Sequence, residues 1–233
     1  MKFEYGTTRE INLVDISNER PPKDYPSGSM IGGECERQVY FAFKHPKKID
    51  DLRVYRIFEL GNLLEDHIVD ILRKRFTVYS VNQDGSQFSF KDDENKITGS
   101  IDGVIVGLPE SDKPHLLEIK TYNQKRYDKL QKEGVKESDP KYYVQMQIYM
   151  NAFDLKKALF VAYNKNTSEI YTERVEYNQL MAMKYLNRSQ KIYSANSHKD
   201  LDRVSERVTD FKCKFCQYKK ECFDDSNSGD KPS

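Results

Sequence analysis

The segment HLLEIKTY, residues 115–122, places two charged side chains two positions apart inside an apolar run. Successive side chains of a β-strand point to opposite faces of its sheet, so Glu118 and Lys120 share one face. Leu117 and Ile119 share the other face, which is apolar. The pattern predicts a carboxylate and an ammonium side by side next to a buried sheet. Taken alone, the pair can also be an ordinary salt bridge, because 32% of the residues are charged.

A second carboxylate lies in the apolar segment GSIDGVIVG, residues 99–107. Asp102 is costly inside such a strand unless it is paired or bound to a cation. The intervening LPESDKP is typical of a short turn, so we expect the two strands to pair and Asp102 to lie beside Glu118. Two adjacent carboxylates repel each other, and a hard divalent cation with oxygen ligands relieves that repulsion.

Lys120 would lie next to such a cation. There an ammonium can orient or help deprotonate a water molecule and stabilise charge on a phosphate. The 15 positions 103–117 separate Asp102 from Glu118, and this order on adjacent strands is typical of a hydrolytic phosphodiesterase site. The alternative is two ordinary strands joined by a salt bridge.

The strongest helical pattern covers residues 54–76, where apolar side chains recur at intervals of three and four. Gly61 and Glu65 lie about one turn apart on one face of this helix. Glu65 could supply a third carboxylate, and Gly61 would leave room for a substrate backbone. The alternative for Glu65 is a solvated glutamate. His67 lies about 200° away around the helix and is interpreted as an ordinary surface or boundary residue.

A later helix, predicted over residues 141–153, places Gln145 and Tyr149 at positions i and i+4. An amide and a phenol on one helix face can hold a phosphate and orient a base. The alternative is a half-buried polar stripe with no part in chemistry.

These elements predict an α/β fold in which a central mixed β-sheet is flanked by helices. No repeat or linker divides the chain, so residues 1–223 are expected to form one domain and residues 224–233 a disordered tail. Residues 1–34, which include NERPPKDYPSGSMIGG, are expected to be irregular. The other expected elements are a helix over 34–43, a hairpin over 77–90 around Asp84 and Gly85, a strand over 96–107, two strands within 157–177 and a helix over 178–195.

The composition, with 37% hydrophobic and 12% aromatic residues, is that of a globular protein. No apolar run of about 18 residues is present, so no transmembrane helix is expected. The N-terminal MKFEYGTTRE contains no apolar signal core, and we expect a cytoplasmic protein of a bacterial, archaeal or phage-infected cell. A net charge of +1 does not by itself indicate a nucleic-acid-binding protein, because a local basic groove disappears in the average.

Four motifs together resemble the PD-(D/E)XK nuclease superfamily in its RecB-like branch. The resemblance covers residues 30–222 and implies a restriction-endonuclease-like core with metal-dependent deoxyribonuclease activity. Two departures are present. Glu65 stands where RecB-like proteins have a histidine, and many phage-type exonucleases of the superfamily also have a glutamate there. Ile101 stands in place of the proline that names the superfamily. In chain order the motifs are GNLLE (61–65), GSIDG (99–103), EIK (118–120) and QMQIY (145–149).

The resemblance implies a role for each residue of the site. Lys120 would position the attacking water, and Gln145 and Tyr149 would contact the substrate. The implied ligands of Mg²⁺ or Mn²⁺ are Glu65, Asp102, Glu118 and the backbone carbonyl of Ile119.

The four cysteines are Cys35, Cys213, Cys216 and Cys222. In a cytoplasmic chain they are not expected to form structural disulfides. Their spacing resembles that of the iron–sulfur nucleases of this branch, such as AddB and the CRISPR adaptation nuclease, in which four thiolates hold a [4Fe–4S] cluster. The alternative is a four-cysteine zinc site, although Cys35 has no nearby partner for a zinc knuckle. A cluster would join residues 30–45 to residues 208–223 in an iron–sulfur subdomain.

Basic and aromatic residues near these motifs are candidate DNA contacts. Arg37 and Tyr40 follow Cys35, and Lys125 and Arg126 belong to a segment rich in Lys, Arg and Tyr over 121–143. Such a segment could line a groove by phosphate pairing and base stacking, or it could be a solvated helix and loop.

The favoured function is an exonuclease acting on single-stranded DNA or DNA ends, without a membrane partner. The phosphate-binding helicase motif G-x-x-x-x-G-K-[ST] is absent, so the nuclease would act alone or within a protein complex. One alternative is an endonuclease or a trimming subunit of a CRISPR spacer-acquisition or recombination complex. Another is a DNA-end-binding protein that does not cleave, against which the complete set of Asp102, Glu118 and Lys120 argues.

Overall fold

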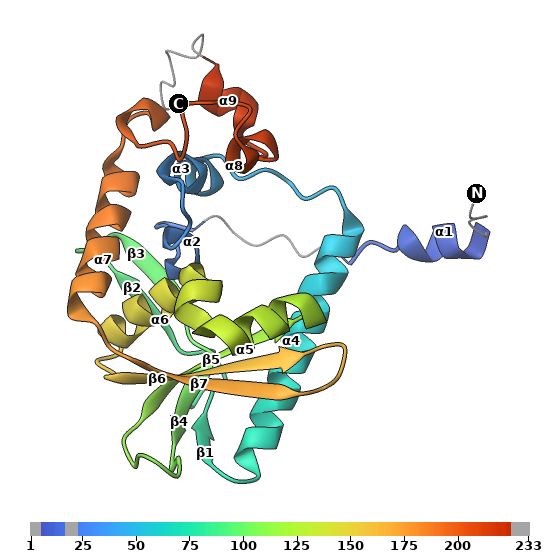
Figure 1. The fold of residues 1–233 in the computed structure, drawn as a ribbon, viewed down its shortest axis with the longest axis vertical. Coiled ribbons are helices and arrows are strands. Elements are labelled where there is room, and N and C mark those ends of the chain that lie inside the picture. The colour runs from blue at the N-terminus through green and yellow to red at the C-terminus, as the bar shows by residue number, and fades with distance from the viewer. Residues whose placement is uncertain (1–5, 17–22, 225–233) are drawn as a thin grey trace.

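A five-stranded sheet with helices on both faces forms the body of the chain (Figure 1). The computed structural model describes residues 6–16 and 23–224, so the predicted disordered tail lies, apart from Asp224, outside the described residues. The strands are β1 (Thr77–Tyr79), β2 (Ser89–Asp92), β3 (Ile97–Ser100), β4 (Gly103–Val106), β5 (His115–Tyr122), β6 (Lys157–Asn164) and β7 (Ile170–Glu176). The helices are α1 (Gly6–Asn12), α2 (Gly28–Ile31), α3 (Glu36–Lys44), α4 (Leu52–Arg73), α5 (Gln124–Ser138), α6 (Pro140–Ala152), α7 (Gln179–Ser194), α8 (Phe211–Lys214) and α9 (Lys219–Phe223), with a 3-10 turn at His198–Asp200.

The sheet is mixed, as the sequence predicts. Its order is β1-β4-β5-β6-β7, with β5 and β6 parallel and the other neighbours antiparallel. The crossover between the parallel strands is made by α5 and α6. None of the helices in the described ranges is both long enough and apolar enough to cross a membrane.

The two faces of the sheet pack against different helices. Leu117 and Ile119 of β5 join a buried cluster with Ile68 and Val69 of α4. The alternate residues face the other side, where the larger core lies and where α6 packs with several buried side chains. The alternation predicted for residues 115–122 is therefore confirmed, and Glu118 faces α6 rather than α4.

The strand predicted over 96–107 is wrong as a single element, because it breaks at residues 101 and 102. β3 pairs with β2 in a separate two-stranded sheet, whereas β4 pairs with β1 and β5. At Gly103 a Cβ would lie 2.7 Å from the carbonyl oxygen of Tyr79, so only glycine allows β4 to approach β1 this closely. The break places Asp102 directly before β4 instead of within a ladder.

The hairpin predicted over 77–90 is correct only next to its turn, where Val81 and Gln87 form an isolated antiparallel bridge. Gly85 has a φ of 82°, and its amide donates to the carbonyl of Asn82 at 3.0 Å. The flanking strands β1 and β2 then separate into different sheets. The signal at Asp84 and Gly85 is local, whereas the choice of strand partners depends on residues far away in the chain.

The irregular N-terminal region predicted over 1–34 is only partly correct, because α1 and α2 form within it. α2 packs closely on α6: a Cβ at Gly28 would lie 2.4 Å from the Tyr149 ring. The helices predicted near 34–43, 54–76, 141–153 and 178–195 are confirmed within a few residues, and α5 forms within 121–143, where a helix and loop are the alternative to a DNA-binding segment.

Candidate active site

The break before β4 gives Asp102 a specific partner. β4 and β5 are paired only from Gly103 and Leu117 onward, so β4 offers no strand partner to Ile119. The Ile119 amide donates instead to Asp102 Oδ2 at 2.7 Å. The predicted pairing of the two strands is confirmed, and it places the Asp102 carboxylate beside the segment that carries Glu118.

The two carboxylate oxygens of the fully buried Glu118 have different surroundings. Oε1 accepts a hydrogen bond from Gln145 Nε2 at 2.7 Å and lies 2.6 Å from Lys120 Nζ. Oε2 is buried and has no hydrogen-bond partner among the described residues. A buried acceptor without a partner costs about 1–3 kcal/mol, and more when it is charged. This is therefore the oxygen with free capacity to bind a cation.

Lys120 connects the two carboxylates. Its Nζ donates to the carbonyl oxygen of Ile119 at 2.9 Å and lies 3.8 Å from Asp102 Oδ2. Its side chain is 22% exposed, more than those of Glu118 and Asp102, so its ammonium lies toward the surface end of the group. Burial alone would lower the pKa of Lys120, but the Glu118 and Asp102 carboxylates outweigh burial and raise it. Lys120 therefore stays positively charged at neutral pH.

Glu65 of α4 belongs to the same electrostatic group. Burial and the nearby Asp102 carboxylate raise the pKa of Glu65 from 4.5 to about 8. Burial, opposed by Lys120 and reinforced by Asp102, raises the pKa of Glu118 from 4.5 to about 7. Three carboxylates thus share one ammonium, and an additional positive charge would allow all three to ionise at neutral pH.

The donor chemistry of this group fits a divalent cation such as Mg²⁺ or Mn²⁺. Within the described ranges, no three His, Cys, Asp or Glu side chains are placed closely enough to form a ready metal site. The oxygens of Glu65, Asp102 and Glu118 are nevertheless hard donors of the type these cations prefer. Glu118 Oε2 has no hydrogen-bond partner among the described residues, and the pKa values of Glu65 and Glu118 are raised. Both observations fit a cluster of carboxylates that can bind a cation.

Gln145 and Tyr149 of α6 have different surroundings in the site. Gln145, 6% exposed, holds Glu118 by the hydrogen bond described above. Tyr149 is 2% exposed, and its ring packs so closely that a Cβ at Gly99 would lie 2.6 Å from it. Burial, followed by the Glu118 charge, raises the pKa of Tyr149. Because both side chains are buried here, their contact with a substrate stays a prediction.

Tyr142 is a neighbour of the site that the sequence reasoning missed. Lys120 Nζ lies 5.5 Å from the centroid of its ring, within the range of a cation–π contact. Tyr142 precedes Gln145 by three positions and Tyr149 by seven, so all three lie on one side of α6. This helical spacing is the sequence signal from which Tyr142 could have been identified as a neighbour of the site.

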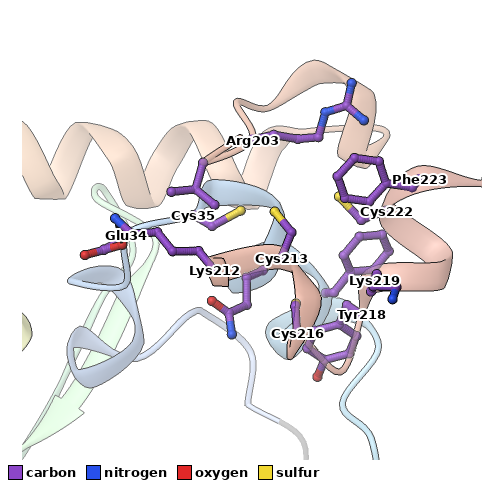
Figure 2. A pocket seen from close by; sticks show the side chains of 13 residues that line it. Glu34, Cys35, Arg203, Lys212, Cys213, Cys216, Tyr218, Lys219, Cys222 and Phe223 are labelled. Atoms are coloured by element: carbon purple, nitrogen blue, oxygen red, sulfur yellow. Dashed lines mark ion pairs between the residues drawn. The ribbon is translucent and has the colours of Figure 1, made fainter. Parts of the chain in front are cut away.

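The four cysteines line one pocket away from the carboxylates (Figure 2). All four are free thiols, and in the figure the sulfur atoms of Cys35 and Cys213 point toward each other. Ion pairs connect the two chain segments across this pocket, Lys212 with Glu34 at 2.6 Å and Lys47 with Glu221 at 2.6 Å. Thiolates are ligands of soft metals, but within the described residues no three of these thiols lie closely enough together to form a ready metal site.

The residues predicted to contact DNA lie in two places. Arg37 donates from Nε to the carbonyl of Leu201 at 2.8 Å, and Tyr40 is 5% exposed. Lys125 and Arg126 are exposed on α5, where Arg126 is ion-paired with Asp139. Arg37, Tyr40 and Arg126 thus have partners within the protein, and Lys125 faces solvent. Contact of any of them with DNA stays a prediction.

Comparison with known proteins finds a family that shares the part of the chain containing the carboxylate group, the cluster formed by Glu65, Asp102, Glu118 and Lys120. A family model described as the YqaJ-like viral recombinase domain matches residues 36–154, about half of the 233 residues. The matched stretch contains Glu65, Asp102, Glu118, Lys120 and Gln145, and it leaves out all four cysteines. No curated protein sequence matches the chain.

Two solved structures of an alkaline exonuclease from Laribacter hongkongensis, LHK-Exo, resemble this chain. The first is 17% identical with a TM-score of 0.51, and the match covers 73% of this chain and 87% of that one. The second, a complex with dAMP, is 16% identical with a TM-score of 0.53, and the match covers 72% of this chain and 86% of that one. At such low identity the likeness establishes a shared fold.

Proposed function

The chain belongs to the YqaJ-like viral recombinase domain family, and from this membership and its buried carboxylate group we propose that it is a metal-dependent DNA nuclease of the PD-(D/E)XK type. Its expected activity is that of an exonuclease on single-stranded DNA or DNA ends. The observation that carries the proposal is the fully buried Glu118, which has one oxygen on Lys120 and Gln145 and the other without a partner.

The groups that would hold Mg²⁺ or Mn²⁺ are the side chains of Glu65, Asp102 and Glu118 and the carbonyl oxygen of Ile119. When bound, such a cation supplies positive charge that stabilises the phosphate and lowers the pKa of a bound water. The Ile119 carbonyl is already directed at the site, because it accepts the hydrogen bond from Lys120. The orphaned Glu118 oxygen and the mutual repulsion of the carboxylates support this assignment.

The side chains of the chain itself have separable tasks. Lys120, protonated and partly exposed, can orient the attacking water and stabilise charge that develops on the phosphate. Gln145 keeps Glu118 from rotating, because its amide holds one carboxylate oxygen. Asp102, which accepts from the Ile119 amide, fixes its carboxylate relative to β5. The Tyr142 ring lies beside Lys120 and limits the positions that the ammonium can take.

We propose in addition that the four cysteines hold a [4Fe–4S] cluster, with zinc as the alternative occupant. This cluster would make residues 30–45 and 208–223 a subdomain of the single nuclease domain over 1–223. Support comes from the convergence of four free thiols on one pocket from chain segments far apart in sequence. Iron and sulfide at about four each per chain are expected after anaerobic purification. Stoichiometric zinc without sulfide would establish the alternative.

The activity test uses the purified full chain with Mn²⁺ and three DNA substrates: 5′-labelled single strands, 3′-labelled single strands and circular single strands. An exonuclease shortens the linear strands progressively from one end and leaves the circle intact. Cleavage of the circle would identify an endonuclease instead. Binding of all three without cleavage, equal in wild type and Asp102→Asn, would establish a DNA-binding protein and refute the nuclease.

A further inference from the structure

Two of the four cysteines, Cys35 and Cys213, form a facing pair in the cysteine pocket (Figure 2). Both side chains line this pocket, and in the figure their sulfur atoms point toward each other. Burial raises the pKa of the Cys213 thiol, and the nearby Asp210 and Cys35 raise it further, so the two sulfurs lie within electrostatic reach of each other. Cys35 is half-buried, whereas Cys213 is only 6% exposed.

Contacts of the neighbouring residues hold this pair together. Glu34 directly precedes Cys35, and Lys212 directly precedes Cys213. Lys212 Nζ lies 2.6 Å from Glu34 Oε2, so an ion pair connects the two chain segments next to the thiols. The Cys213 amide donates to the carbonyl of Asp210 at 3.0 Å, which fixes the thiol within the first turn of α8. The two sulfurs are therefore brought together without any rearrangement of the fold.

The remaining two cysteines are placed differently. The Cys216 amide donates to the carbonyl of Cys213 at 3.1 Å, so these two residues belong to one turn. Cys222 lies in α9, where its amide donates to the carbonyl of Tyr218 at 2.9 Å. A disulfide restricts the unfolded chain more when it closes a longer loop. A link between Cys35 and Cys213 would close nearly the whole chain, whereas a link between Cys213 and Cys216 would close a single turn.

We propose that Cys35 and Cys213 form a reversible disulfide with each other when their thiols hold no metal. The oxidant is a low-molecular-weight disulfide such as glutathione disulfide. Cys35, the more accessible thiol, attacks one sulfur of this molecule, so that a mixed disulfide forms and one glutathione thiolate leaves. Cys213 then attacks the Cys35 sulfur, so that the Sγ–Sγ bond forms and the second glutathione leaves. The two cysteines lose two protons and two electrons, which convert one glutathione disulfide into two glutathione thiols.

This disulfide would join the same two parts of the chain that the proposed cluster joins. A thiolate that is bound to a metal is not free to attack a disulfide, so the metal and the disulfide exclude each other. Arg203, Lys212 and Lys219 also line the pocket, and their positive charge suits the carboxylates of glutathione. The link is reversible and therefore differs from a permanent structural disulfide.

The test maps the disulfide in the full chain. The chain is treated with a chelator under reducing conditions, transferred to glutathione disulfide and digested with trypsin without a reductant. Cleavage after lysine and arginine separates the four cysteines, in the order of the sequence, into the peptides 24–37, 213–214, 215–219 and 221–233. We expect one linked product, the first peptide with the second, whose mass is lower by two hydrogens than the sum of the two. Dithiothreitol should release both peptides.

Three variants and a stability measurement sharpen the test. Cys35→Ser and Cys213→Ser should each abolish the linked product. Cys222→Ser is the matched control, because it removes a thiol outside the pair, and it should keep the product. The oxidised wild type should unfold at a temperature about 5–10 °C above that of the same preparation after dithiothreitol, because the link closes a long loop.

Three results would overturn the proposal: a link between Cys213 and Cys216, a mixture of pairs, or no linked peptide in the chelator-treated wild type. Failure of the proposed cluster is read separately, from the iron, sulfide and zinc content before chelation. If the wild type contains no metal and still links Cys35 to Cys213, the disulfide stands and the cluster falls.

Discussion

The carboxylate group and the cysteine pocket are two polar clusters that the fold supports in opposite ways. Glu118 is fully buried, held by an amide of α6 and an ammonium of its own strand. The cysteines lie on short helices and loops that exposed or half-exposed ion pairs such as Lys212 with Glu34 hold together. Ion pairs of that kind contribute only about 0–1 kcal/mol each. The first cluster therefore lies within the protein core, whereas the second lies at its margin, where Cys216 and Cys222 are only partly buried against it.

The extent of the family match follows the same division. Residues 36–154 contain the carboxylate group completely and none of the four cysteines. Changes at the carboxylate group should accordingly alter chemistry and leave the fold in place. Changes at the cysteine pocket should alter stability and leave the chemistry in place.

Replacement of Lys120 should have the largest effect. Lys120→Ala removes the ammonium that lies 2.6 Å from Glu118 and 3.8 Å from Asp102. Cleavage should fall at least about a hundredfold, the usual scale for loss of a positioned acid–base or electrostatic group. Mn²⁺ affinity, measured by calorimetry, should persist or increase, because the cation loses a like-charged neighbour. Glu118→Ala should instead lose both Mn²⁺ affinity and cleavage.

The matched control for this pair is Lys91, which lies 2.6 Å from Asp24 in an exposed ion pair. Lys91→Ala should leave cleavage unchanged and change the free energy of unfolding by less than about 0.5 kcal/mol. Normal cleavage by Lys120→Ala would make the β5 pair an ordinary salt bridge as well and remove this strand from the catalytic assignment.

Loss of one thiol should have the next largest effect, and on stability. Cys222→Ser should lose iron and sulfide together and lower the free energy of unfolding by about 2–3 kcal/mol, the stabilisation from a ligand present at about a hundred times its Kd. Mn²⁺-dependent cleavage at low temperature should remain close to that of the wild type. Lys219→Ala, which changes the same pocket without removing a thiol, should keep the iron.

A cleavage defect in Cys222→Ser that is as large as that of Lys120→Ala would contradict the division between the two clusters. The measurements are iron and sulfide content, thermal unfolding and cleavage of an end-labelled strand, all on the same preparation.

The carboxylate group could largely be predicted from sequence because its determinants are local. The alternation in HLLEIKTY fixes the common face of Glu118 and Lys120, and one short turn fixes the pairing that brings Asp102 to β5. The break before β4 could not be predicted, because it depends on the approach of Gly103 to Tyr79 from another strand. The use of Gln145 to hold Glu118 is likewise a contact between a helix and a strand that no local pattern specifies.

The uncovered half of α4 illustrates the same limit. Its apolar spacing predicts a helix that packs along its whole length, and the structure confirms the helix. Ile57 and Leu60 belong to that spacing but lie beyond the end of the sheet, so they are exposed although the pattern marks them as core. Periodicity identifies the apolar face of a helix, but only the tertiary structure decides how much of that face is covered.

A smaller effect is expected from Glu65 as a dependence of stability on pH. The folded chain raises the pKa of Glu65 from 4.5 to about 8, so the folded state holds this proton more firmly than the unfolded state. Without a divalent cation, the stability from this group is present below about pH 4.5 and is lost as the pH rises to about 8. Glu65→Gln cannot ionise, and at pH 8 in EDTA it should be more stable than the wild type by about 1 kcal/mol or more.

Added Mn²⁺ should reverse this order, because the cation stabilises the ionised wild-type carboxylate and not the amide. Glu59→Gln, at an exposed position of the same helix, is the control and should follow the wild type at every pH. A Glu65→Gln variant whose stability runs parallel to that of the wild type, with and without Mn²⁺, would remove Glu65 from the group.

The smallest effect is expected on α5, where neither cluster contributes. Lys125 is exposed there, and if it contacts a phosphate, each such contact accounts for about 0.7 to 0.9 of the slope of log K against log salt. Lys125→Ala should therefore weaken DNA binding a few-fold for every sequence and reduce that slope by about one, with no change in unfolding. Lys184→Ala on α7 is the control and should leave the slope unchanged. An unchanged slope for Lys125→Ala would make α5 a solvated helix and would place the phosphate contacts elsewhere on the chain, because a net charge of +1 can hide a local basic groove.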